Sequence, residues 1–319
     1  MKGNGLSPGK KYRLRLALLG TLLLVVQIAW GQPTAPTLTS GTLGAVGSDT
    51  MAGLVLRWGE ALTARHPDIN LQFQAGGSAS APTALIAGTT RLGPMSRPMS
   101  ATERQQFIDR YGYPPLELRV ARDALIVVVH RHNPLDALTR QQIDAIFSTS
   151  LACGATRPIR RWETLLETAQ WPYGHIALHG RNLASGTHGL FKQQALCNGQ
   201  FRVDISEHPG SSAVVAAVGE SPNAMGYAGY NHLTPMVKAL PLADQHGNTL
   251  APTDSSIQRD DYPFSRDLYL YVNLPPGESL PAAEQAFIAL IMSPEGQAIV
   301  RASGFVPLPP EELNAQQPW

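Results

Sequence analysis

The sequence predicts an α/β fold with two lobes. Along the first part of the chain, a short strand, a small polar turn and a helix follow one another three times, a rhythm typical of α/β proteins. About 288 residues remain once an N-terminal targeting segment is set aside, which exceeds one comfortable hydrophobic core. The 29 glycines and 26 prolines indicate many short elements joined by specified turns.

The first 31 residues have the pattern of a secretory signal peptide. A basic segment without acidic residues contains Lys2, Lys10, Lys11, Arg13 and Arg15. An apolar run from Leu16 to Trp30 follows, and Ala29-Trp30-Gly31 places small residues where signal peptidase reads them. We therefore expect cleavage near Gly31-Gln32, a linker over 32–40 and a mature protein in the periplasm. No cysteine lies near the cleavage point, so we expect no lipid anchor on the mature protein.

Removing the signal changes the charge of the chain. Five of its 25 basic residues lie in that segment, so 20 basic residues remain against 24 acidic ones. A mildly acidic protein without basic runs is a poor nucleic-acid binder, and we expect no nucleic-acid partner. The two cysteines, Cys153 and Cys197, predict one disulfide in an oxidising compartment, with two buried thiols as the alternative.

Strands and helices can be placed in order along the first half of the mature chain. Alternation of apolar and polar residues, or a short apolar run, predicts each strand, and apolar residues at helical spacing predict the helices. The expected elements are a strand over 41–47, a helix from Ser48 to about Ala64, a strand over 69–74, a helix ending near Ala87-Gly88, a strand over 91–93, a helix from Ala101, and extended segments over 116–121 and 124–130.

The second half follows the same patterns. The expected elements are a helix over 140–147, a strand over 176–179, a helix ending near Cys197, a helix over 213–218, an extended segment over 224–227, a strand over 268–272, and helices over 282–292 and 295–302. The middle of the chain is interpreted as the second lobe.

Residues 181–187 are the strongest candidate for a binding site. Arg181 is followed four positions later by Ser185-Gly186-Thr187, and a segment able to start a helix comes next. Free N–H groups at a helix start, two hydroxyls and a guanidinium suit an oxyanion, although a capped helix with a surface arginine is the simpler alternative. Hydroxyls also stand at three earlier strand-to-helix junctions, with Ser48 and Thr50, with Ser78, and with Ser96-Arg97. Ligands of α/β proteins gather at such junctions.

Other chemistry is weakly represented. The histidine pairs at 130 and 132 and at 175 and 179 have no supporting carboxylate or cysteine nearby, so we expect no metal. The sequence contains no Gly-x-Ser-x-Gly elbow, phosphate-binding P-loop or His-Glu-x-x-His motif, and we expect neither cofactor nor catalysis.

The sequence resembles the phosphate-binding-like family of periplasmic solute-binding proteins, which serve the phosphate-specific ABC transporter. The resemblance covers residues from about 43 to 308. Its motifs are Gly47–Met51, Gly76–Ser78, Gly93–Pro98, Asn133–Leu135, Ile146–Ser148, Arg181–Thr187, Gly226-Tyr227 and Ser293–Gln297. The resemblance implies the two-lobed type II periplasmic-binding-protein fold, with a mixed sheet and flanking helices in each lobe and the ligand cleft between them.

The resemblance also implies a ligand set for inorganic phosphate. The first lobe, expected over 41–123 plus 238–319, would supply the Thr50 hydroxyl, the Met51 N–H and Ser78. The second lobe, expected over 124–237, would supply Arg181, Ser185, Gly186 and Thr187. Extended crossings near Asp123-Ala124 and around 233–240 would join the lobes and act as hinges.

One position departs from part of the family. Some members have an aspartate at the position of Ser96, where it accepts a proton from phosphate and so rejects fully ionised sulfate. Here Ser96 is followed by Arg97, and we place both in the ligand set, since an arginine favours a dianion. Asp49 and Asp123 are the candidate proton acceptors, because they lie next to site segments.

The expected function is capture of phosphate and its delivery to an ABC-transporter permease in the inner membrane by a monomeric, non-catalytic protein. Two alternatives stay within binding: another oxyanion, such as sulfate, molybdate or arsenate, or a phosphate scavenger or sensor without a permease. An exported phosphatase on the same scaffold is the alternative of another class, and it would need a nucleophile beside a base.

Overall fold

A computed structural model describes residues 41–167, 169, 171–244 and 246–316. The predicted signal peptide and linker lie outside these residues. The described residues belong to one compact unit. None of the described helices is both long enough and apolar enough to cross a membrane.

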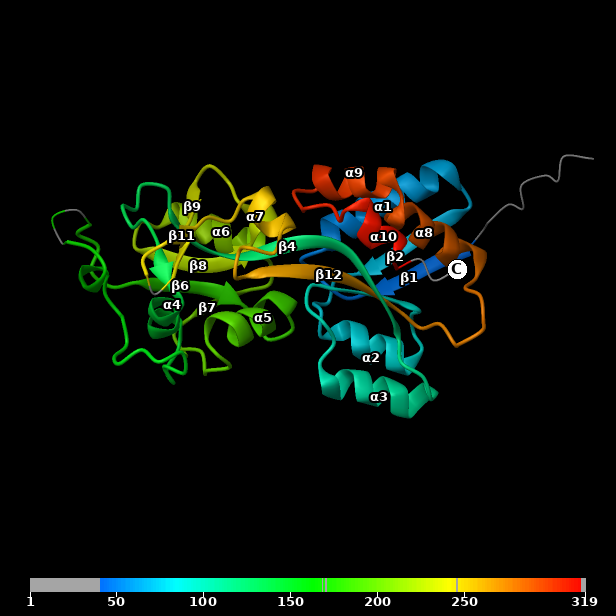
Figure 1. The fold of residues 1–319 in the computed structure, drawn as a ribbon, viewed down its shortest axis with the longest axis horizontal. Helices are drawn as coiled ribbons and strands as arrows, with labels where there is room; N and C mark the ends of the chain where they lie inside the picture. The colour runs from blue at the N-terminus through cyan, green and yellow to red at the C-terminus, as the bar shows by residue number, and fades with distance from the viewer. Residues whose placement is uncertain (1–40, 168, 170, 245, 317–319) are drawn as a thin grey trace, which may run out of the picture. The chain divides into compact units, whose positions relative to one another are not determined.

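One mixed sheet, with nine strands in the described residues, is the framework of the fold (Figure 1). Its order is β2 (Ile69–Gln74), β1 (Gly41–Val46), β3 (Leu92–Met95), β12 (Ser265–Val272), β4 (Leu116–His130), β8 (Ala224–Gly229), β6 (Ala177–Arg181) and β7 (Ser206–His208), with β9 (Val237–Ala239) also paired to β4. A small second sheet has the order β11 (Thr249–Leu250), β10 (Leu242–Ala243) and β5 (Leu138–Thr139).

Helices follow most of the strands of the first lobe and several of the second, and three come in succession after β12. The helices are α1 (Ala52–Arg65), α2 (Ser80–Ala87), α3 (Ala101–Tyr111), α4 (Arg140–Phe147), α5 (Gly186–Ala195), α6 (Ser211–Glu220), α7 (Asp254–Gln258), α8 (Ala282–Met292), α9 (Pro294–Ala302) and α10 (Pro310–Asn314), with short 3-10 turns at Trp162–Thr164 and Tyr230–His232. The predicted α/β class is confirmed.

Strand β4 belongs to both parts of the sheet. It pairs antiparallel with β12 over Leu116–Ala124 and with β8 from Leu125 onward. The prediction of two separate extended segments here is wrong, because Arg122 and Asp123 continue the strand. They stand opposite Asp267 and Arg266 of β12, so both charged residues are paired across the strands.

Helices cover both faces of the first part of the sheet, which forms the first lobe. Helices α1, α8 and α9 pack together over one face, and α2 and α3 lie on the other (Figure 1). Successive side chains of β12 point to opposite faces of the sheet, so this strand contributes to the cores on both faces. Leu270 and Val272 enter the cluster with α1 and α8, while Tyr271 enters the cluster with α2 and α3.

The second lobe is built in the same way around the other half of β4. Leu125, Val127 and Val129 join one core with residues of α4 and α5, and Ile126 and Val128 join another with α6. A strand buried on both faces needs apolar residues at every position, which explains the continuous apolar run. The two-lobed expectation is confirmed.

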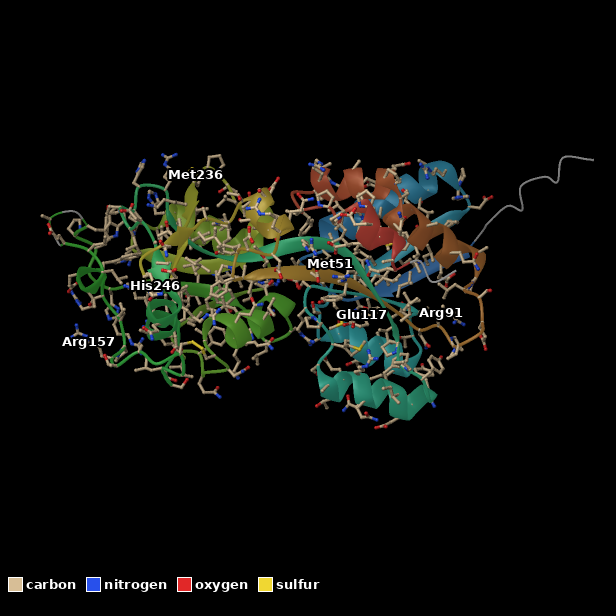
Figure 2. All side chains as sticks on the ribbon, viewed as in Figure 1. Met51, Arg91, Glu117, Arg157, Met236 and His246 are labelled. Atoms are coloured by element: carbon tan, nitrogen blue, oxygen red, sulfur yellow. A yellow bond between two sulfur atoms is a disulfide. The ribbon has the colours of Figure 1, made fainter. Side chains whose placement is uncertain are left out.

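Two further features belong to the second lobe. Cys153 and Cys197 form the predicted disulfide, which the stick view draws as a yellow bond between two sulfur atoms (Figure 2). The segment between β9 and β12 also packs here, because Leu240, Ile257 and Phe264 belong to the same core as Leu125.

Candidate anion-binding site

The loop between β1 and α1 carries Ser48, Asp49 and Thr50. The sequence predicts that these residues open the helix, but α1 starts later, and its N-cap is Met51 without a side-chain cap. The hydroxyls of this loop are therefore free for other partners. Ser48 Oγ is buried without a hydrogen-bond partner in the described part of the chain, and Thr50 is 3% exposed.

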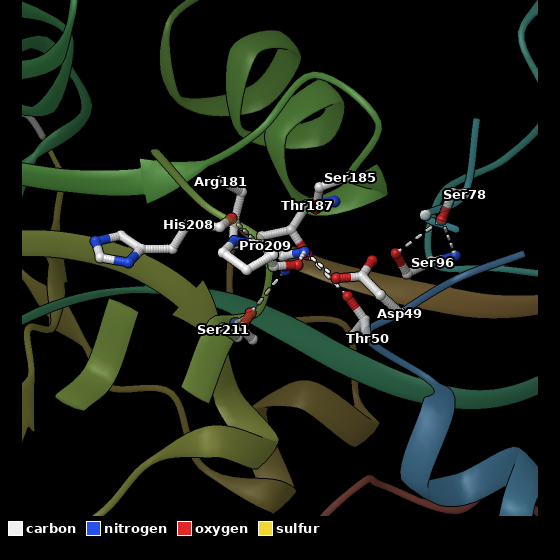
Figure 3. A network of polar contacts seen from close by, with 12 residues as sticks. Asp49, Thr50, Ser78, Ser96, Arg181, Ser185, Thr187, His208, Pro209 and Ser211 are labelled. Carbon is white, nitrogen blue, oxygen red and sulfur yellow. Dashed lines mark hydrogen bonds and ion pairs between the residues drawn. The ribbon is translucent and has the colours of Figure 1, made fainter. Parts of the chain in front are cut away.

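Ser78 and Ser96 come together on the next two junctions of the first lobe. Ser78 precedes α2, Ser96 follows β3, and their Oγ atoms lie 3.1 Å apart (Figure 3). The backbone N–H of Ser96 donates to Ser78 Oγ at 3.0 Å. Both side chains are fully buried. Strands β2 and β3, which these residues follow, both run parallel to β1, and this explains the convergence, because their carboxyl ends lie at the same edge of the sheet.

The second lobe presents the start of α5 to these residues. Ser185 is the N-cap, and its Oγ accepts a hydrogen bond from the N–H of Thr187 at 3.1 Å. Thr187 Oγ1 lies 3.2 Å from Thr50 Oγ1, so hydroxyls from the two lobes are in contact. A Cβ added to Gly186 would lie 2.4 Å from Ser78 Oγ and 2.5 Å from Ser96 Oγ. Glycine is therefore required for this approach.

Arg181, at the end of β6, is 1% exposed and held on several sides (Figure 3). Its Nε donates to the carbonyl of His208 at 3.2 Å, and its Nη1 donates to Ser211 Oγ at 3.1 Å. Its Nη2 donates to the carbonyl of Pro209 at 2.8 Å and is paired with the Asp49 carboxylate of the first lobe. The guanidinium is thus fixed at the junction of the lobes.

Burial sets the protonation of this arginine and its neighbour. Burial lowers the pKa of Arg181, and Asp49 opposes that shift. The guanidinium remains protonated at neutral pH, since its ordinary pKa is far higher. Burial also raises the pKa of Tyr227, whose hydroxyl accepts from the backbone N–H of Arg181 at 3.1 Å. Tyr227 is therefore a neutral support for the end of β6.

The two candidate proton acceptors have different partners. Asp49 pairs with Arg181, and its Oδ1 is buried without a hydrogen-bond partner in the described part of the chain. Asp123 is fully buried, and its Oδ2 accepts from Nε of Arg266 at 3.0 Å. Asp123 Oδ1 likewise has no partner in the described residues.

Arg266 lies in contact with the candidate site residues, and sequence reasoning missed it. It lies near the start of β12, and its Nη1 donates to Thr187 Oγ1 at 3.0 Å. The available signal was an arginine between two polar residues at the entry of an apolar strand. That pattern is common on exposed strand ends, so the sequence did not distinguish it.

The guanidinium of Arg97 is held away from the other candidate ligand residues. It forms a two-pronged ion pair with Glu103, at 2.7 Å for each contact, and its Nη1 also donates to the carbonyl of Pro98. Glu103 belongs to the capping box of α3 together with Ser100. Arg97 therefore fixes the start of a helix in this structure.

The arrangement as a whole is suited to an anion. Hydroxyls of both lobes meet beside a buried guanidinium, and such donors match the oxygens of a tetrahedral oxyanion. The described residues contain no group of three or more His, Cys, Asp or Glu placed to hold a metal ion.

The fold and this junction define the class of the protein, which is a two-lobed α/β protein of the periplasmic-binding-protein type. Residues 32–295 match the family described as the PBP superfamily domain, and the chain belongs to that family.

Named relatives are consistent with this class. The chain is 44% identical over 271 residues to the phosphate-binding protein PstS of Pseudomonas aeruginosa, covering 85% of this chain and 84% of that protein. It is 24% identical to the PstS of Staphylococcus saprophyticus over 97% of this chain and 93% of that one.

Solved structures share the fold. A putative phosphate ABC transporter substrate-binding protein from Clostridium perfringens, with bound phosphate, has a TM-score of 0.69 at 23% identity over 84% of this chain and all of that one. A possible phosphate-binding protein from Planctomyces limnophilus has a TM-score of 0.63 at 25% identity, covering 87% of this chain and 96% of that one.

Proposed function

We propose that this protein binds inorganic phosphate between its two lobes and delivers it to the permease of an ABC transporter. The contact of Thr50 with Thr187 beside Arg181 is the observation that carries the proposal. It joins both lobes at a cluster of donors, so an anion placed there would hold the lobes together. The names of the relatives give the same ligand.

The proposed phosphate ligands are those predicted from the sequence, and the structure bears differently on Arg97. Thr50, Ser78, Ser96 and Thr187 would supply hydroxyls, Met51 and Gly186 would supply backbone N–H groups, and Ser185 and Arg181 would complete the set. Arg97, also predicted as a ligand, would first have to release Glu103, which holds its guanidinium in this structure. The Thr50–Thr187 contact must open for a phosphate oxygen to enter, so binding requires a small movement of the lobes.

We propose that the lobes meet at β4 and β12. The first crossing lies at Asp123-Ala124, as expected from the sequence. Because Leu240, Ile257 and Phe264 pack in the core of the second lobe, we place the return crossing near Ser265, further along the chain than 233–240. Hinge motion would then be confined to the middle of β4 and the start of β12, which pair at Ala124 and Ser265.

Direct binding is the test of the proposed function. Titration calorimetry on the mature protein should give phosphate binding, and Arg181→Ala should weaken it by about 2–5 kcal/mol, as expected for a buried charged partner. Arg202→Ala is a matched control, because Arg202 is also a buried, ion-paired arginine of the second lobe but is paired with Asp204 instead of a site residue. A loss of less than about tenfold in Arg181→Ala would contradict the central role of this arginine.

Discrimination against sulfate would be the task of a carboxylate. Asp49 is the better candidate, because it lies against Arg181 and keeps a buried Oδ1 that has no partner among the described residues and can accept the proton of hydrogen phosphate. The ratio of phosphate to sulfate affinity should fall in Asp49→Asn. Asp123→Asn is the companion variant, and an unchanged ratio in both would exclude a proton-reading role for either residue.

Delivery, location and the absence of catalysis are also proposals. The predicted signal peptide supports export to the periplasm, and the family supports a permease partner for a monomeric binding protein. Transporter genes beside this gene would support that partner, and their absence would favour a scavenger or sensor. A panel of oxyanions separates phosphate from sulfate, molybdate and arsenate. Turnover of a chromogenic phosphate ester by the purified protein would instead establish a phosphatase.

A further inference from the structure

Arg266 is a second buried arginine at the junction of the lobes. It is 5% exposed and stands opposite Asp123 in the register of β12 and β4. Its Nε and Nη2 both donate to Asp123 Oδ2, which is itself fully buried. This pairing fixes the plane of the guanidinium and directs its remaining nitrogen toward the site.

That remaining nitrogen touches candidate ligands of both lobes. Nη1 donates to Thr187 Oγ1 of the second lobe at 3.0 Å and to the carbonyl of Ser96 in the first lobe at 3.3 Å. Arg181, by contrast, is held by groups of its own lobe and by Asp49. The two arginines therefore approach the Thr50–Thr187 contact from different elements, β12 and β6.

The chemistry of Thr187 connects Arg266 to the ligand. A hydroxyl has one hydrogen to donate and two lone pairs that can accept. Because Arg266 donates to Thr187 Oγ1, the hydroxyl hydrogen of Thr187 is left for an anion. An anion oxygen that replaces Thr50 as the partner of Thr187 Oγ1 approaches Nη1, which is 3.0 Å from the same atom, and would accept the Nη1 hydrogen that the Ser96 carbonyl accepts at 3.3 Å in this structure.

We propose that Arg266 is a second guanidinium ligand of the bound oxyanion and that Asp123 is its positioning residue. This inference rests on the proposed function and deepens it. A second positive charge at the ligand favours the dianion of phosphate over the monoanion. The competing interpretation is that Arg266 and Asp123 form an ion pair that only joins the strands.

The test compares phosphate affinity in the wild type, Arg266→Gln, and the double variant Asp123→Asn with Arg266→Gln. The phosphate affinity of Arg266→Gln should be lower than that of the wild type by a factor of about 30 or more, as expected when a charged group that touches the ligand is lost. The double variant replaces both charges by amides of similar shape, so no buried carboxylate is left unpaired. If Arg266 binds the anion, the double variant stays weak. If the pair only joins the strands, the double variant recovers wild-type affinity, and the inference is overturned.

A pH series gives a readout that a structural role does not change. Wild-type affinity should rise as phosphate passes through its second ionisation, and this rise should be smaller in the double variant because one cationic ligand is missing. Equal pH dependence in the two proteins would count against the inference.

Arg122→Gln is the matched control, since Arg122 is an ion-paired arginine of the same strand pair that contacts Asp267 and Glu312 instead of a site residue. It should bind phosphate like the wild type. Phosphate binding by the wild type with no loss in Arg266→Gln would overturn this inference alone. Absence of phosphate binding in the wild type would overturn the proposed function and this inference with it.

Discussion

Gly186→Ala tests the contact between the lobes with a single methyl group. In the present structure the added Cβ would lie 2.4 Å from Ser78 Oγ, 2.5 Å from Ser96 Oγ and 2.9 Å from Ser78 Cβ. All three atoms belong to the first lobe, whereas Gly186 belongs to the second. The methyl group therefore opposes the approach of the two lobes and leaves the packing of each lobe's hydrophobic core unchanged.

The expected magnitude follows from these distances. Forcing one extra carbon into a closely packed contact costs about 1–3 kcal/mol. Because this cost falls on the closed state that holds the ligand, phosphate affinity should fall by about 5- to 150-fold. The ligand-free protein should keep its thermal midpoint, since the lobes can separate slightly to relieve the contact. Titration calorimetry and thermal unfolding without phosphate measure the two quantities.

Gly189→Ala is the control on the same helix. Its Cβ would lie 3.7 Å from Arg97 Cδ and 3.8 Å from Arg97 Nε, which is ordinary contact. Phosphate affinity should therefore stay near that of the wild type. Equal affinity of Gly186→Ala and the wild type, or an equal loss in both variants, would refute the proposed closure at this glycine.

Three further predictions concern stability. Gly53→Ala adds a Cβ in the first turn of α1 with no atom within 4 Å, so it should raise the free energy of unfolding in urea by about 0.5 kcal/mol, the lower end of the range for a helix interior; an unchanged or lower value would contradict this. Replacing both Cys153 and Cys197 by serine opens a link between residues 44 positions apart, and should lower that free energy by about 2–4 kcal/mol; equal stability would contradict a constraining disulfide. Burial, with smaller effects of Lys192 and Arg181, lowers the pKa of His188 from 6.5 to about 4. The unfolded chain therefore takes up the proton first as pH falls, and stability should drop by about 3 kcal/mol between about pH 6.5 and 4. Thermal melts of His188→Gln should lack this part of the decline, and parallel pH profiles would contradict it.

The sequence was most informative where a pattern is local. Strand β2 and helix α4 begin and end at the predicted residues, because alternation and helical spacing depend only on near neighbours. The convergence of the hydroxyls at the strand-to-helix junctions could also be predicted, because parallel strands bring their carboxyl ends to one edge of the sheet. Ser78 and Ser96 meet for this reason.

The sequence misled where a partner lies far along the chain. The sequence predicted a break at Arg122 and Asp123, but β12 supplies opposite charges at the same register. A local partner was missed as well: Arg97, predicted as an anion ligand beside Ser96, is paired in this structure with Glu103, which is six positions along the chain and belongs to the capping box of α3.

The sequence alone determined the α/β class, the order of the main elements and the segment containing Arg181 and Thr187, because these depend on composition and short-range spacing. Only the tertiary structure decided which charges meet. Asp49 and Arg181 are 132 positions apart, and Asp123 and Arg266 are 143 apart. Such pairs follow from strand register and from the packing of the two lobes, and those are set by burial of apolar side chains throughout the fold rather than by the residues beside each charge.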